Sequence, residues 1–211
     1  MIQTEMLVLV LMLVACCWGR LVEVPLQRQV LVQPETGAPW PPAPAWQDKP
    51  TMARYLVHYS DWTVMSAFSP EYMQPFGTLQ SYADGPMGNS TGVPYFYIAK
   101  ISDTYRNLAY NNTVAVTMTE NESELCKKQG YDPEEPPCSR VTLTGKAVAV
   151  TDPADLEFAK LSLFTRHPAM KTWPTGHDWN FYKLVPTHVH LLDYYGGASH
   201  VPLADYYKAK P

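Results

Sequence analysis

VTLTGKAVAV, residues 141–150, carries the clearest structural signal in this chain. Apolar or small residues alternate with polar ones through most of it, which is the period-two pattern of a strand with one buried face. Gly145 interrupts the alternation, and a glycine inside a strand indicates a bulge or a close backbone approach. The stretch therefore predicts a long strand with a bulge at Gly145.

Other β-branched and aromatic runs, separated by turn-rich loops, predict six more strands. All seven predicted strands are Trp62–Ser69, Gly77–Ala83, Val93–Ala99, Thr113–Thr119, Val141–Val150, Trp179–Val185 and His188–Tyr195. One longer helix is predicted after Asp152 and Pro153 and before Pro168, and a short one from Thr51 to Tyr59. This pattern is typical of a mainly β protein of the α+β class, a barrel with helical insertions.

The composition agrees with a folded β domain. Twenty prolines in 211 residues argue against a helical bundle, because an interior proline breaks a helix. A chain that is 46% hydrophobic and 17% charged is too apolar to be disordered. The net charge of −4, without a basic stripe, gives no drive for direct nucleic-acid binding.

The N-terminal segment is predicted to be a targeting signal rather than part of the folded domain. The apolar run 6–17, MLVLVLMLVACC, is shorter than the roughly 20 residues that a membrane span needs. Trp18, Gly19 and Arg20 follow at once, which suits the small-residue end of a signal peptide. We expect a signal peptide over 1–19, a proline-rich leader over 20–50 and one folded domain over 51–211, with no membrane span and a secretory destination.

Loss of the signal would leave two cysteines, Cys126 and Cys138, on either side of a short polar loop. In an oxidising compartment such a pair indicates a disulfide. Two unpaired thiols or intermolecular pairing are the alternatives. Zinc is not expected here, because the pair has no CxxC motif and no nearby histidine.

Three glycosylation sequons fit a secretory protein. They begin at Asn89, in a Gly/Pro-rich loop, at Asn111, at a strand entrance, and at Asn121, in an acidic connector. The loop position makes Asn89 the first expected site of glycan attachment.

Polar and aromatic residues concentrate in two places that we treat as a candidate cleft or anion-binding site. The six candidates are His58, Ser60, Arg166, His167, Lys171 and Trp173. Arginine and lysine suit phosphate recognition. A structural role is the alternative, because cations at a helix C-terminus interact favourably with its carbonyls.

Catalytic and metal motifs are missing from the sequence: there is no GxSxG, HExxH, Walker loop or GxGxxG, and no catalytic residue is assigned. His188 and His190 would share one face of a strand and could ligate a metal if a third ligand converged on them. A solvent-facing pair is the alternative, so no resident metal is expected.

Long blocks of this sequence resemble the CREG family of secreted glycoproteins. The similarity covers HYSDWTVMSAFS, SYADGPMGNSTGVPYFYIA, CKKQGYDPEEPPC, AKLSLFTRHPAMKTWPTGHDWNFYKL and LLDYYGGA, between about residues 53 and 207. The resemblance implies a split β-barrel of the FMN-binding, pyridoxamine-phosphate-oxidase-like type, and a homodimer built across the barrel faces.

The same resemblance implies a glycoprotein of the secretory and endosomal–lysosomal route, linked to growth restraint and differentiation. It implies sorting through the mannose-6-phosphate/IGF-II receptor or an equivalent, a non-catalytic role, and no cofactor. The alternative is a flavin-binding protein or flavin-dependent oxidoreductase that holds FMN in the barrel cleft.

Overall fold

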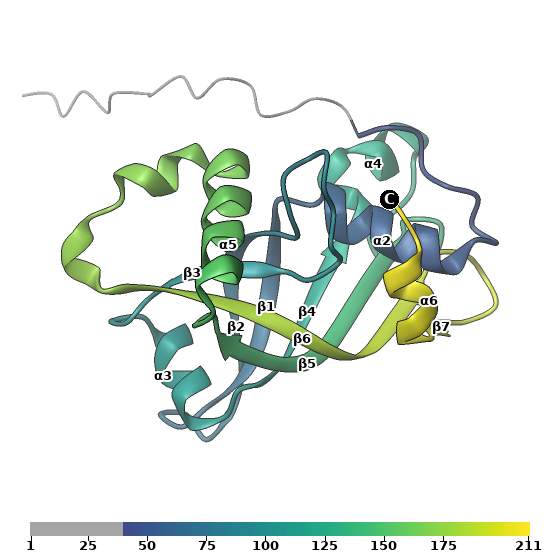
Figure 1. Ribbon diagram of the computed structural model, residues 1–211. Coiled ribbons are helices and arrows are strands. Elements are labelled where there is room, and N and C mark those ends of the chain that lie inside the picture. Colours follow the sequence, from purple (N-terminus) through teal and green to yellow (C-terminus); the bar gives the residue numbers. More distant parts are fainter. Residues whose placement is uncertain (1–39) are drawn as a thin grey trace, which may run out of the picture. The chain divides into compact units, whose positions relative to one another are not determined.

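The computed structural model describes residues 40–211, so the predicted signal peptide and most of the predicted leader lie outside the described residues. Seven antiparallel strands form one sheet (Figure 1). Their order is β3-β2-β1-β4-β5-β6-β7, and an additional pairing of β3 with β6 closes the first six into a barrel. The strands are β1 (Trp62–Ser69), β2 (Gln74–Ala83), β3 (Tyr95–Ala99), β4 (Thr113–Thr119), β5 (Arg140–Ala149), β6 (Trp179–Leu192) and β7 (Ser199–Val201).

The helices lie between the strands and at the ends of the domain. They are α2 (Lys49–Tyr59), α3 (Asp103–Tyr110), α4 (Leu125–Gln129), α5 (Pro153–Arg166) and α6 (Leu203–Lys208), with 3₁₀ turns η1 (Glu120–Ser123), η2 (Pro168–Thr172) and η3 (Thr175–His177). The predicted longer helix is confirmed as α5, with the Asp152 side chain accepting from the Asp155 amide at 2.9 Å. The short helices α3 and α6 were not predicted.

Helix α2 begins earlier than the sequence indicated. Asp48, rather than Thr51, is its N-cap, and its carboxylate accepts a hydrogen bond from the Thr51 amide. Residues assigned to the leader also pack on the domain: Trp40 lies edge-on to Tyr55, 5.6 Å between ring centroids, and the Tyr55 hydroxyl donates to the Pro41 carbonyl at 2.7 Å. The packed domain therefore begins before Thr51.

The predicted irregularity at Gly145 is confirmed, with the extra residue, Thr187, on the partner strand, and it explains why the sequence divided β6 in two. The β5–β6 register shifts between Thr144 and Gly145, and Gly145 pairs with Pro186. A proline has no amide to donate, so a bulge is where a strand tolerates it. The two predicted strands 179–185 and 188–195 are therefore one continuous β6, which ends at Leu192.

Two apolar clusters fill the domain. The larger lies inside the barrel and under α2, and includes Leu56, Met65, Val116, Leu143 and Leu184. The smaller lies under α5 and joins it to β2, β3 and the turn after the helix; its buried members are Ala83, Tyr95, Val150, Ala159, Leu163 and Met170. Figure 1 shows α5 beside β3 and α2 beside α6, so the helices cover separate parts of the barrel.

A third feature is what we call the outer barrel face, the outward-pointing residues of β2, β1, β4, β5, β6 and β7. Paired residues of antiparallel strands project to the same side, so the register defines its rows. One row is Leu79, Val64, Thr117, Thr142, His190 and His200, and the next is Gly77, Ser66, Ala115, Thr144 and His188. Neither row contains a carboxylate, a lysine or an arginine.

No helix in the described part of the chain is both long enough and apolar enough to cross a bilayer.

Candidate functional site

Arg166, the last residue of α5, reaches back to the junction between α2 and β1. Its guanidinium donates to the carbonyls of His58 at 2.8 Å and Ser60 at 3.0 Å, and to the Asp61 carboxylate at 2.8 Å. The side chain is almost fully buried. The structure thus brings three predicted site residues together, but Arg166 holds two main-chain carbonyls that the end of α2 leaves without helical partners.

The His58 ring is also engaged within the fold. Its Nδ1 lies 2.7 Å from Asp84 Oδ1 and its Nε2 lies 3.0 Å from the Met87 carbonyl oxygen, and the ring is buried. Arg54, one helical turn earlier, donates to the carbonyl and hydroxyl of Ser90 at 2.9 and 2.7 Å. Together these contacts fix the loop 84–92, which carries the sequon at Asn89.

The other three predicted site residues lie apart from this junction. His167 follows α5, and its Nε2 lies 2.8 Å from the Tyr82 carbonyl oxygen; burial lowers the pKa of this imidazole. Lys171 is exposed on the η2 turn. Trp173 belongs to a different group of side chains, described next.

Trp173 lies in an aromatic cluster where the end of β3 pairs with the start of β6. Tyr97 stacks on Trp179 at 4.8 Å and on Trp173 at 6.1 Å between ring centroids. A hollow of about 240 Å³ opens beside these rings. Its lining is Leu79, Gln80, Ser81, Tyr97, Ile98, Ala99, Ser102, Met170, Trp173 and Trp179. Sequence reasoning found only Trp173 of this set, because Tyr97 and Trp179 read as ordinary strand aromatics.

The lining of the aromatic hollow fits an apolar or planar ligand better than a phosphate. An FMN phosphate is usually held by arginine or lysine forks, and none of the ten lining residues is cationic. Arg166, the arginine that the sequence offered as an anion ligand, is bonded within the fold, and so is Arg54. The residues that line this hollow therefore do not fit the phosphate end of FMN.

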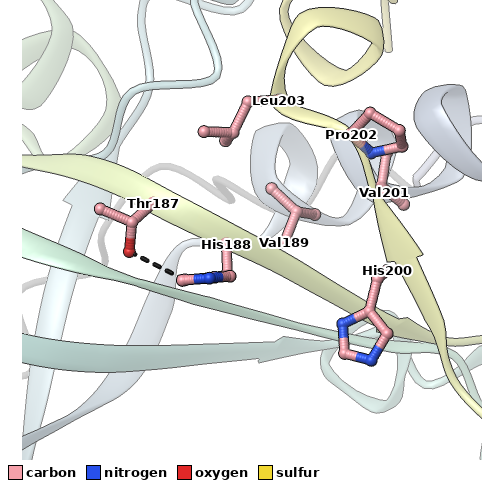
Figure 2. Close-up of a pocket in the computed structure, with 7 residues that line it drawn as sticks. All are labelled: Thr187, His188, Val189, His200, Val201, Pro202 and Leu203. Carbon is pink, nitrogen blue, oxygen red and sulfur yellow. Dashed lines mark hydrogen bonds between the residues drawn. The ribbon is translucent and has the colours of Figure 1, made fainter.

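A second hollow, of about 310 Å³, lies between β6 and the segment that follows β7 (Figure 2). Its lining is Thr187, His188, Val189, His200, Val201, Pro202 and Leu203. His188 was a sequence candidate for metal binding together with His190, and His200 was not. Within residues 40–211, no group of three or more histidine, cysteine or acidic side chains is placed to hold a metal ion.

Glu122 is a half-buried acid that the sequence presented only as the middle residue of a sequon. Its Oε1 accepts from the Asp61 amide at 2.6 Å, at the same α2–β1 junction that Arg166 holds. Burial raises the pKa of this carboxyl to about 7. No local pattern could have indicated this contact, because the partners are 61 residues apart.

The predicted disulfide between Cys126 and Cys138 is confirmed; the Cα atoms are 5.3 Å apart. It ties α4 to the start of β5. Of the three sequon asparagines, Asn89 and Asn111 are exposed and Asn121 is half-buried in η1. Asn111 caps α3, and its side chain accepts from the Thr113 amide at 2.9 Å.

Comparison with known proteins places this fold in a family. The family model described as "CREG, beta-barrel" matches residues 44–208. Protein CREG1 of Homo sapiens is 40% identical over 170 residues, which cover 79% of this chain and 77% of that protein. The chain belongs to the CREG family.

A mouse CREG protein is similar over a smaller share of its own length. Protein CREG2 of Mus musculus is 42% identical over 162 residues, which cover 75% of this chain and 56% of that protein. The chain therefore spans little more than half of that relative.

Solved structures support the split-barrel fold expected of a CREG protein. A heme binding protein from Mycobacterium smegmatis superimposes with a TM-score of 0.62 at 17% identity, covering 81% of this chain and 63% of that one. A Clostridium acetobutylicum protein of the pyridoxinephosphate oxidase family gives 0.51 at 11% identity, covering 76% and 99%. At these identities the likeness concerns the fold alone.

Proposed function

We propose that this CREG protein is a non-catalytic, dimeric glycoprotein of the secretory and endosomal–lysosomal route, which acts through receptor or partner contacts. The proposal rests on the observation that the candidate site residues at the α2–β1 junction bond to groups of their own chain. His58 and Arg166 are buried and bonded to carbonyls or carboxylates of their own chain, and so is Arg54, which was not a sequence candidate. Groups that would bind or transform an anionic substrate instead stabilise the fold.

The secretory part of the proposal draws support from the disulfide, since disulfides persist in oxidising compartments. The exposed Asn89, held out on a loop fixed by His58 and Arg54, is suited to carry a glycan. A glycan there is the feature through which a mannose-6-phosphate/IGF-II receptor, or an equivalent sorting receptor, would recognise the protein. Growth restraint and differentiation would follow from such contacts.

Glycosylation is tested by expressing the whole chain in mammalian cells and treating the secreted product with an N-glycosidase. We expect a gel-mobility shift in the native protein and a smaller one in Asn89→Gln. Receptor capture should fall after glycosidase treatment and in the presence of free mannose-6-phosphate. A protein that stays in the cytosol, or shows no shift, contradicts the proposal.

The dimer is proposed to form across the outer barrel face, at its β1–β2 end. Leu79 and Val64 pair across these strands and are 67% and 41% exposed. Trp62, 40% exposed, lies next to Val64 on the same side of β1. The two rows that cross this end carry no charge, and the charged residues of β5 on the same face, Arg140 and Lys146, lie two strands away. Exposed large apolar side chains in such a place favour self-association over a charged partner.

Light scattering after size exclusion tests the dimer on glycosidase-treated protein. We expect twice the chain mass for the native protein and one chain mass for the pair of changes Val64→Lys and Leu79→Lys. Leu161→Lys is the matched control, because Leu161 is also exposed but lies on α5. A native protein of one chain mass at micromolar concentration contradicts the dimer.

Flavin binding remains a second candidate function because the aromatic hollow is a stacking surface on a split barrel. FMN added to the purified protein would quench the fluorescence of Trp173 and Trp179 if their rings stacked on the isoalloxazine. We expect no saturable quenching, since the lining has no cation for the phosphate. Tight binding, or a yellow purified protein, would favour the flavin function.

A further inference from the structure

The histidines of this chain are unevenly distributed over the fold. The sequence has six, all within the described residues. His58 is buried, and His167 and His177 are half-buried. The three exposed histidines, His188, His190 and His200, all lie on β6 and β7.

Two of the three lie directly opposite each other. Strands β6 and β7 are antiparallel, and their register pairs His190 with His200. The ring centroids are 5.2 Å apart and the ring planes cross at 78°. The side chains project from the same side of the sheet, because cross-strand partners do.

This separation matches that of two imidazoles on one metal ion. A metal–nitrogen distance of about 2.0–2.1 Å and a tetrahedral angle place the two ring centroids roughly 5 Å apart. A ring pair that already has this spacing on two bonded strands loses little freedom when it takes up an ion.

The surroundings of the pair suit a partly hydrated ion. On the β5 side the neighbour of His190 is Thr142, so no lysine or arginine lies next to the pair in its row. Both imidazoles are exposed, so water can reach the ligand positions that two histidines do not fill. His200 is also one of the residues around the hollow of about 310 Å³, which His190 does not line (Figure 2). His188 is turned to other partners: its Nδ1 lies 3.0 Å from Thr187 Oγ1 and 3.4 Å from Thr144 Oγ1.

We propose that His190 and His200 form a two-imidazole chelate for a divalent transition-metal ion, with water in the remaining positions. Imidazole ligands suit copper, zinc and nickel, and Cu²⁺ is bound most tightly of the divalent first-row ions. The proposal goes beyond the function proposed above and does not depend on it, since both ligands come from one chain.

Calorimetric titration of the purified whole protein with Cu²⁺, in a buffer that does not bind metal, tests the site. We expect one ion per chain and nitrogen hyperfine structure from imidazole in the electron paramagnetic resonance spectrum. His190→Gln and His200→Gln should each weaken binding by roughly tenfold or more, at least the loss seen when a supporting group of a metal site is removed.

His177→Gln is the control, because it removes a histidine near β3 and leaves the cross-strand pair intact. It should bind Cu²⁺ like the native protein. His190 and His200 are exposed and His177 is half-buried, and unchanged melting temperatures verify that each variant folds. Native-like binding by both His190→Gln and His200→Gln, an equal loss in His177→Gln, or a spectrum without imidazole nitrogen would overturn the proposal.

Discussion

Polar side chains at the α2–β1 junction stabilise this fold through contacts that their sequence context does not indicate. Arg166 closes the junction by donating to His58, Ser60 and Asp61. Glu122 accepts from the Asp61 amide on the same segment. The residues that looked most like a ligand site are thus the ones that hold a helix end to a strand start, where main-chain groups need partners.

Arg166→Ala should destabilise the protein rather than alter a binding activity. The change leaves the carbonyls of His58 and Ser60 without their donor, which costs about 2–3 kcal/mol. The melting temperature should fall by roughly 5–10 °C. Arg166→Lys should recover only part of the lost stability, since an ammonium group cannot reproduce the planar guanidinium fork.

Lys171→Ala is the control for that experiment. Lys171 is exposed on the η2 turn, so its loss should leave thermal melting unchanged. An Arg166→Ala protein that melts like the native one would instead return Arg166 to the list of ligand-binding residues.

Glu122 should make the stability of the protein depend on pH. Burial raises the pKa of its carboxyl from the usual 4.5 to about 7 in the folded state. The folded protein therefore binds this proton more tightly than the unfolded chain does. Its contribution is fully present below about pH 4.5 and is lost as the pH rises through 7.

Denaturant unfolding at pH 5 and pH 8 tests this. We expect Glu122→Gln to be more stable than the native protein at pH 8, by about 1–2 kcal/mol after allowance for solvent screening, and similar to it at pH 5. The same difference at both pH values would contradict this assignment. Greater stability in acid would suit the endosomal–lysosomal destination proposed above.

At the scale of elements, the β5–β6 ladder determines how the barrel curves and where β6 continues. Gly145 stands against Pro186 at the register shift, and a Cβ atom added to it would lie 2.1 Å from the Val185 carbonyl oxygen. The contact is with backbone, so it cannot be relieved by a side-chain rotation. Glycine is needed here for close approach rather than for an unusual backbone angle.

Gly145→Ala should therefore lower the free energy of unfolding by about 2–3 kcal/mol, the range of an overpacked site. Gly176→Ala is the matched control, because no atom lies within 4 Å of its added Cβ. Chemical denaturation of the two variants and the native protein measures the difference. Equal midpoints for all three would mean that the ladder accommodates the methyl group by a backbone shift.

At the scale of the whole molecule, the residues before α2 act as part of the domain. Trp46 stacks on Tyr194 at 4.7 Å, and the Lys49 ammonium lies 2.6 Å from the buried Asp193 carboxylate. With Trp40 and Pro41 against Tyr55, these contacts join the start of the described chain to α2 and to the segment after β6. The signal-peptide and leader assignments within residues 1–39 stay predictions.

A chain that starts at Thr51 should consequently be less stable than one that starts at Gly37. It loses the contacts of Trp40, which is half-buried, and of Trp46, which is 42% exposed, so we expect a cost of about 1–3 kcal/mol, below that of removing a core tryptophan. Thermal melting of the two shortened chains side by side measures the loss. If both melt at the same temperature, the domain boundary lies at Thr51 as the sequence indicated.

The sequence by itself determined the local structure of this protein. Alternation along the chain predicted strands β1 and β4, and capping residues predicted helix α5. A lone glycine predicted the bulge at Gly145, and the expected oxidising compartment predicted the pairing of the two cysteines. These signals all come from residues close to one another in the sequence. The long stretches of sequence that resemble the CREG family also indicated the split barrel. The β3–β6 closure itself was decided by tertiary structure, because it pairs residues that are 80 or more positions apart.

Tertiary structure alone decided what the candidate site residues do. Arg166 and His58 are 108 residues apart, and whether a guanidinium meets a ligand or a carbonyl depends on which segments the barrel brings together. The same holds for His190 and His200, which sequence spacing does not connect and strand register does. Side-chain type limits the available chemistry, and long-range packing selects the partner.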